Sequence, residues 1–195
     1  GVLGSNLCRF FDPRLASSIT LRGHEILQKS RDFIEAKGHR VIYGDTDSVF
    51  VHAAGHADPE LLGRQLASEL NAWWQAKLRS EFDLACHLEM EFETHYEQFV
   101  MPTIRGTEMG SKKRYAGWQL SAGEYRLIFK GLEAVRSDWT ALAKRFQLSL
   151  YERVFRNQPY KALITETVLD LKAGKLDEQL IYKRRLRRSI EHYDK

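Results

Sequence analysis

Two carboxylates lie between two short apolar runs, in the segment Tyr43-Gly44-Asp45-Thr46-Asp47-Ser48. The flanking runs, Val41-Ile42 and Val49-Phe50-Val51, are β-branched or aromatic, which favours strands. The glycine and the short polar residues between them favour a tight reversal of the chain. The sequence therefore predicts a β-hairpin with Asp45 and Asp47 at its tip.

Two carboxylates this close repel each other unless a cation or a proton offsets their charge. Magnesium suits such a pair, because it binds through one or two carboxylates and keeps waters or substrate phosphates as its other ligands. A solvated, aspartate-rich turn is the alternative, and Asp-x-Asp by itself leaves it open because short motifs match often by chance. The residues around the pair have to decide between the two interpretations.

Composition limits the class of protein. Of the 195 residues, 43% are hydrophobic and 29% are charged, which is typical of a globular protein with one core, or one core and a smaller one. The net charge of +4 is compatible with nucleic acid but is weak support for it. Cys8 and Cys86 give no disulfide framework and suit a reducing cytoplasm. No apolar run reaches membrane-spanning length, and no signal-peptide pattern opens the chain.

The pattern of apolar residues alternates between helical and strand spacing. Asp12-Pro13 and Asp58-Pro59 are typical helix starts, with Asp as the cap and Pro in the first turn. The expected elements, in order, are a helix over 14–37, the hairpin within 40–53, a helix over 58–80, strands within 86–131, and helices over 139–156 and 160–173. Strands backed by helices and followed by a helical lobe indicate an α+β fold.

Polar and apolar residues alternate from His87 to Glu93, which is the period of a half-buried strand. The four tryptophans are expected to be core or partly buried residues rather than base-stacking platforms: Trp73, Trp74, Trp118 and Trp139.

Several blocks of the chain resemble one enzyme family. Tyr-Gly-Asp-Thr-Asp-Ser at 43–48 is similar to the motif of family B DNA polymerases that supplies metal ligands in the palm domain. Residues 1–24 resemble the end of the family's fingers helix and the helix after it. Residues 112–117 resemble its Lys-Lys-x-Tyr block, and 129–139 the segment that leads into its thumb. The blocks follow the family's order, cover nearly the whole chain, and are most like those of bacterial members.

The resemblance implies a polymerase palm over residues 1–135, with an antiparallel sheet backed by helices. The N-terminal part of a mostly helical thumb would follow over 136–195. We expect the chain to be a piece of a longer protein, because the family's upstream palm aspartate and its nucleotide-gripping lysine have no counterpart here. The chain alone is therefore expected to be inactive.

The same resemblance implies roles for three acids. Asp45 and Asp47 would be catalytic and would bind Mg²⁺, with Mn²⁺ as a substitute, and Asp47 would be the principal ligand. Glu93 aligns with a third metal-binding acid of the family, although it could also be one acid among several on a solvated strand face. In the full-length parent these residues would serve template-directed nucleotidyl transfer by two metal ions.

The block Lys112-Lys113-Arg114-Tyr115 is expected to bind DNA, since cations contact phosphates and the resemblance implies that the lysine and tyrosine hold the primer end. On a strand, Lys113 and Tyr115 would point to the same face. Three cations alone would indicate only a solvated basic patch. A second basic run covers 183–188.

The implied partners are primer–template DNA and deoxynucleoside triphosphates, with a sliding clamp bound through regions outside this chain. The implied location is the nucleoid in a bacterial cytoplasm. Two alternatives stay open: a module that grips duplex DNA without copying it, and, with less support, a phosphatase with an aspartate nucleophile. A calcium loop is excluded because Val49 occupies a ligand position. Zinc is excluded because no cysteines or histidines have paired ligand spacing.

Overall fold

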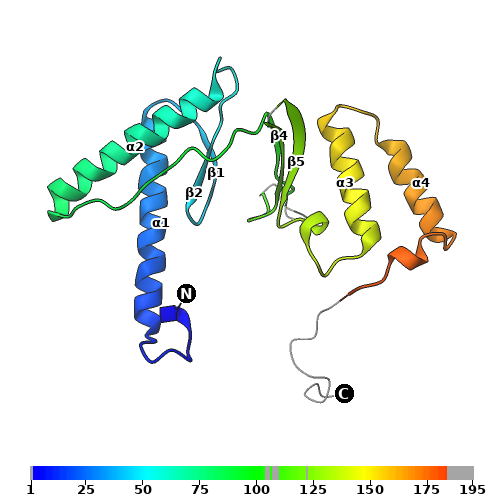
Figure 1. The fold of residues 1–195 in the computed structure, drawn as a ribbon, viewed down its shortest axis with the longest axis horizontal. Coiled ribbons are helices and arrows are strands. Elements are labelled where there is room, and N and C mark those ends of the chain that lie inside the picture. Colours follow the sequence, from blue (N-terminus) through cyan, green and yellow to red (C-terminus); the bar gives the residue numbers. More distant parts are fainter. Residues whose placement is uncertain (1, 104–105, 107–109, 122, 184–195) are drawn as a thin grey trace. The chain divides into compact units, whose positions relative to one another are not determined.

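The computed structural model describes residues 2–103, 106, 110–121 and 123–183. The chain divides into two compact units, Gly1–Thr94 and His95–Lys195, and each is described by itself. Both contain helices and a small antiparallel sheet, which confirms the α+β prediction (Figure 1). The expected boundary between palm and thumb, near residue 135, lies inside the second unit and stays a prediction. Of the basic run at 183–188, residues 184–188 lie outside the described residues.

Two long helices dominate the first unit, after a short 3₁₀ helix, η1 (Val2–Gly4). They are α1 (Pro13–Ala36) and α2 (Pro59–Phe82). The carboxylate of Asp12 accepts a hydrogen bond from the Arg14 amide at the start of α1, and Asp58 accepts one from the Leu61 amide at the start of α2. Both helix starts are therefore built as the Asp-Pro pairs predicted, with the side chain satisfying an otherwise unpaired amide.

The hairpin between these helices consists of β1 (Val41–Asp45) and β2 (Ser48–Val51). The strands pair antiparallel, from Val41 opposite Val51 to Asp45 opposite Ser48, with an irregularity between Val41 and Tyr43. It lies beside α1 (Figure 1). The predicted hairpin with both aspartates at its tip is confirmed.

The core of the first unit forms where both helices meet the hairpin. Ile34, Leu70 and Trp74 are its buried centre. The partly buried apolar residues packed on them come from α1, α2, both strands and the segment after α2: Ile26, Phe33, Val41, Val49, Val51, Trp73, Leu78, Cys86, Leu88 and Met90. The indole N–H of Trp74 donates to the buried Ser30 hydroxyl at 2.9 Å, which satisfies both polar groups.

The strand expected over 87–93 is wrong as secondary structure, although its burial pattern is right. Side chains alternate between exposed and partly buried from 85 to 94, but these residues form no β-ladder within the described residues. Alternation requires only one covered face, whereas a strand also needs a neighbour for its backbone hydrogen bonds. Here α2 covers the face, and the side chain of Asn71 pairs with the backbone of Met90.

The second unit begins with a three-stranded antiparallel sheet in the order β3 (Gln98–Val100), β4 (Tyr115–Ser121) and β5 (Glu124–Lys130). Up to residue 183, where the described part of the chain ends, four helical elements follow it: η2 (Glu133–Val135), α3 (Ala141–Phe155), α4 (Lys161–Lys172) and η3 (Asp177–Gln179). The hydroxyl of Thr140 accepts a hydrogen bond from the Ala143 amide, so α3 begins two residues later than the apolar pattern indicates.

The core of the second unit joins the sheet to α3. Its buried residues come from β4, β5, the loop after β5 and the end of α3: Ala116, Trp118, Phe129, Leu132 and Phe155. Trp74 and Trp118 are buried, and Trp73 and Trp139 are partly buried, which confirms the prediction for the tryptophans. Across the residues that the structure describes, no helix is both long and apolar enough to cross a bilayer. Cys8 and Cys86 are free thiols.

Candidate functional site

The hairpin tip is a two-residue turn that presents both carboxylates. Asp45 ends β1 and is partly buried, whereas Asp47 lies in the turn and is exposed. Thr46 between them has a φ of 54°, and the Asp47 amide donates to the Asp45 carbonyl at 2.6 Å. The hydroxyl of Thr46 donates to the Asp45 carboxylate at 3.0 Å, and that of Ser48 to the Asp47 carboxylate at 3.4 Å. These local contacts orient the two acids.

Helix α1 supports the hairpin directly behind the first acid. A Cβ atom added at Gly44 would lie 3.2 Å from Cδ2 of Leu27 on α1, so a larger residue would require that side chain to shift by a few tenths of an ångström. Across the hairpin, the rings of Tyr43 and Phe50 pack with centroids 5.4 Å apart. The carboxylates therefore stand on a short, well-supported strand pair.

Glu93 lies in the extended segment after α2. Asn71 on α2 fixes this segment: it accepts a hydrogen bond from the Met90 amide at 2.8 Å and donates to the Met90 carbonyl at 2.9 Å. Phe92 then packs over Gly63, where an added Cβ would lie 2.2 Å from its ring. Because side chains alternate along the segment, Glu93 points to the exposed side.

The structure does not bring Glu93 together with the hairpin acids as one ligand set. Within the described ranges, no three His, Cys, Asp or Glu side chains gather closely enough to hold a metal ion. Asp45 and Asp47 are hard oxygen donors, and two such carboxylates fit Mg²⁺ when waters and substrate phosphates complete its shell. The donor set fits the implied metal but is incomplete without a substrate.

The basic block lies in the second unit, at and before the start of β4. Lys112 and Lys113 are exposed and lie in a turn, and Lys113 has a φ of 63°. Tyr115 is the first residue of β4 and is partly buried against the rings of Phe99 and Tyr96, at centroid distances of 5.2 and 6.3 Å. The expectation that strand geometry puts Lys113 and Tyr115 on one face is wrong, because Lys113 has a left-handed backbone conformation outside the strand.

Arg114, between these residues, is held by an ion pair. Its Nη2 atom donates to a carboxylate oxygen of Glu133, whose side chain is only 18% exposed. The amide of Gln147 on α3 donates to the other carboxylate oxygen at 2.7 Å. Burial alone would raise the pKa of Glu133, but the bonds from Gln147 and Arg114 outweigh it and hold that pKa below its ordinary value.

Sequence reasoning missed Glu133 and Gln147. Glu133 lies 19 positions after Arg114, and Gln147 lies 14 positions after Glu133, so no local spacing connects them. The only available signal was that Glu133 falls in a block with a family resemblance.

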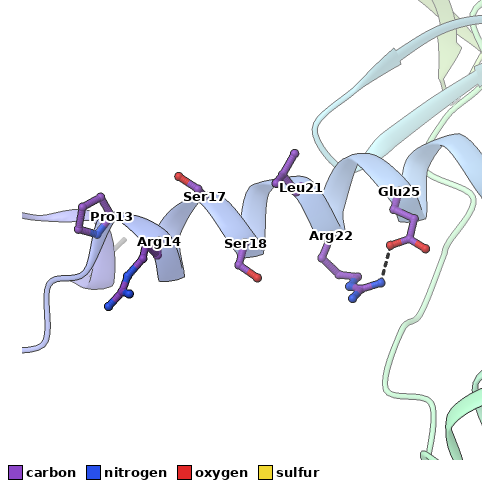
Figure 2. A pocket seen from close by; sticks show the side chains of 7 residues that line it. All are labelled: Pro13, Arg14, Ser17, Ser18, Leu21, Arg22 and Glu25. Carbon is purple, nitrogen blue, oxygen red and sulfur yellow. Dashed lines mark hydrogen bonds and ion pairs between the residues drawn. The ribbon is translucent and has the colours of Figure 1, made fainter.

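A surface hollow of about 560 Å³ lies along the first half of α1 and contains none of the predicted site residues. Figure 2 shows that its lining comes from this one helix: Pro13, Arg14, Ser17, Ser18, Leu21, Arg22 and Glu25. Arg22 and Glu25 form an ion pair at its edge (Figure 2). Since one exposed helix face supplies every side chain, the hollow provides no converging polar groups for a ligand.

Comparisons with known proteins agree on one family. The sequence model of DNA polymerase family B matches residues 1–195. The chain is 53% identical to DNA polymerase II of Escherichia coli over its whole length, which is 25% of that protein. It is 33% identical to a DNA polymerase of Archaeoglobus fulgidus, with 94% of this chain and 21% of the relative aligned. The DNA polymerase alpha catalytic subunit of Mus musculus is 30% identical over 74% of the chain and 9% of its own length.

Proposed function

This chain belongs to DNA polymerase family B, and from that premise we propose that the longer protein containing it copies DNA templates by nucleotidyl transfer. The chain spans about a quarter or less of the length of these relatives, so the activity concerns the whole protein. The observation that carries the proposal is the carboxylate pair at the hairpin tip. Asp45 and Asp47 are separated by one residue, Thr46, at the tip of a hairpin that packs against α1.

Phosphoryl transfer depends on positioning and charge stabilisation more than on a reactive side chain. Asp45 and Asp47 would hold Mg²⁺, or Mn²⁺ in its place, which when bound would supply charge stabilisation for the transfer. The hairpin contributes rigidity, because its acids are oriented by Thr46 and Ser48 before any substrate binds. Glu93 is the proposed third ligand, and the segment that carries it is fixed by Asn71.

The substrates under this proposal are primer–template DNA and deoxynucleoside triphosphates. Lys112, Lys113, Arg114 and Tyr115 form the proposed DNA-binding block, which the exposure of both lysines supports. A sliding clamp would bind through other parts of the protein, and the site of action would be the nucleoid in the bacterial cytoplasm.

A second candidate is a module that grips duplex DNA without copying it. The basic block belongs to a unit with its own core, so a grip on DNA does not depend on the hairpin. Duplex affinity without turnover in the full-length protein would favour this candidate.

Substitution Asp47→Asn in the full-length protein tests the polymerase proposal. It keeps the shape of the side chain and removes its charge, so primer extension should fall at least ~10²-fold, as it does when other transition-state charge stabilisation is lost. The matched control is Asp83→Asn at the end of α2, an exposed acid whose φ of 52° an asparagine tolerates. Near-normal extension by Asp47→Asn, measured beside an active control, would contradict the proposal.

A further inference from the structure

We propose that Arg114 is a positioning residue: through Glu133 and Gln147 it ties the basic block to helix α3, and it does not itself neutralise a DNA phosphate. This inference rests on the proposed DNA-binding function of the block and assigns different roles to its cations. Lys112 and Lys113 would contact phosphates, while Arg114 would hold the backbone that presents them. All the contacts involved lie within the second unit.

The backbone of Lys113 lies in close contact with the loop after β5. Gly131, just after β5, has a φ of 62°, and a Cβ atom added there would lie 2.1 Å from the Lys113 carbonyl oxygen and 3.4 Å from Cγ of Arg114. Only glycine can occupy this position without displacing the basic block. The loop after β5 is therefore moulded to the main chain of Lys113.

The side chain of Arg114 is held against the protein. Two residues past Gly131, Glu133 binds the guanidinium through the ion pair, and Nε of Arg114 is buried with no hydrogen-bond partner in the described part of the chain. A side chain that binds a DNA phosphate needs its N–H donors exposed to solvent, where the duplex can reach them. The Arg114 side chain is 42% exposed, but the edge of its guanidinium that carries Nε faces the protein.

Gln147 connects this ion pair to α3. The side-chain amide of Gln147 donates to Glu133 at 2.7 Å, and its carbonyl accepts a hydrogen bond from the Ala134 amide, also at 2.7 Å. Both polar atoms of this amide on α3 therefore hold η2, which follows the loop after β5. The same loop inserts Leu132, which is 1% exposed, into the core beside Phe155 of α3.

Together these contacts form a continuous link from Lys113 through Gly131, Glu133 and Gln147 to α3. A shift of α3 would have to move the turn that carries both lysines, or break a partly buried charged hydrogen bond. The position of α3 and the presentation of the lysines are thus coupled, and loss of Arg114 should weaken DNA binding without removing a phosphate contact.

Salt dependence separates a phosphate contact from a positioning role. The 195-residue chain is titrated with a labelled primer–template duplex at several salt concentrations. In a plot of log affinity against log salt concentration, Lys113→Gln should make the negative slope shallower by about 0.9, the value for one lost phosphate contact. Arg114→Gln should weaken binding about fivefold or more, the lower end of typical coupling between linked sites, and leave the slope unchanged. An equal loss of slope in Arg114→Gln would overturn the inference.

Glu133→Gln tests the sign of the effect. If Glu133 were only a negative charge near the duplex, its neutralisation would raise affinity; under the positioning role affinity falls, and the double variant Arg114→Gln/Glu133→Gln loses no more than either single one. Higher affinity in Glu133→Gln contradicts the inference. Arg145→Gln, which removes an exposed cation from α3, is the control for the positive charge lost in Arg114→Gln.

A measurement without DNA keeps the two proposals apart. Failure of the unmodified chain to bind duplex would overturn the DNA-binding proposal alone. Amide hydrogen exchange in Gln147→Ala would still decide the link: exchange at Lys113–Gly117 should accelerate at least about fivefold while α4 keeps its protection, because local opening is confined to the released segment. Unchanged exchange at Lys113–Gly117 would overturn the inference.

Discussion

Glu133 carries a charge where burial opposes it, and this gives the second unit a specific sensitivity to acid. Burial raises the pKa of Glu133, but the hydrogen bonds from Gln147 and Arg114 lower it by more. The pKa therefore lies below the ordinary value of 4.5. A carboxylate with a depressed pKa contributes stability that is fully present above its unfolded pKa and is lost as pH falls through its folded pKa. The contribution should therefore disappear below pH 4.5.

Urea unfolding of Glu133→Gln at about pH 7 and about pH 3 measures this contribution. The variant should be less stable than the unmodified chain at the higher pH and nearly equal to it at the lower pH, because protonation also removes the charge from the native residue. Glu166→Gln, an exposed acid on α4, is the control for a general charge effect. A destabilisation of Glu133→Gln that is the same at both pH values would contradict the prediction.

Gly131 offers a second prediction at this scale, with Gly123 as its control. Both glycines have positive φ, 62° and 80°, but only Gly131 faces a backbone atom; the space around Gly123 is open. Gly123→Ala should cost about 1–2 kcal/mol, the strain of a left-handed alanine. Gly131→Ala should cost roughly 1–3 kcal/mol more, because it also overpacks the Lys113 carbonyl. Equal losses in urea unfolding would show that the contact is not tight.

At the scale of elements, two helical glycines should respond in opposite directions. Gly23 on α1 has open space around it, so Gly23→Ala should stabilise the first unit by about 0.5–1 kcal/mol through helix propensity. Gly63 on α2 faces the ring of Phe92, so Gly63→Ala should destabilise it by roughly 1–3 kcal/mol. Thermal unfolding of both variants checks the sign. Stabilisation by Gly63→Ala would mean that Phe92 does not seat on α2.

The helices and the hairpin could be predicted because their signals are local. Asp12-Pro13 and Asp58-Pro59 place a cap and a fixed φ at neighbouring positions, and the structure uses both. The segment that contains Glu93 could not be assigned in the same way. Its alternation reports which side chains are covered, but whether it becomes a strand depends on a hydrogen-bonding neighbour, which no local pattern specifies.

Across the whole molecule, some candidate site residues are brought together by a local motif and others only by tertiary contacts. Asp45 and Asp47 are close in sequence and in space, so their motif predicts their geometry. The role of Arg114 depends on Glu133 and Gln147, which only the folded second unit brings to it. The resemblance placed Arg114 in a DNA-binding block because it lies between Lys113 and Tyr115, while the contact that distinguishes it from Lys113 is tertiary.

The last prediction concerns the 195-residue chain as a metal-binding and catalytic unit. Its described residues supply one carboxylate pair and no third ligand close by, and such a pair holds Mg²⁺ poorly without substrate phosphates. Mn²⁺ titration followed by spin resonance should therefore show binding no tighter than ~10⁻³ M, the weak end of carboxylate sites for divalent ions. Asp47→Asn should weaken it further, while Asp83→Asn should leave it unchanged. Primer extension by the chain should be undetectable, because charge stabilisation by a weakly held metal cannot supply the rate. Tight binding that survives Asp47→Asn would place the metal away from the hairpin, and templated extension by the purified chain would show that its own residues complete the site.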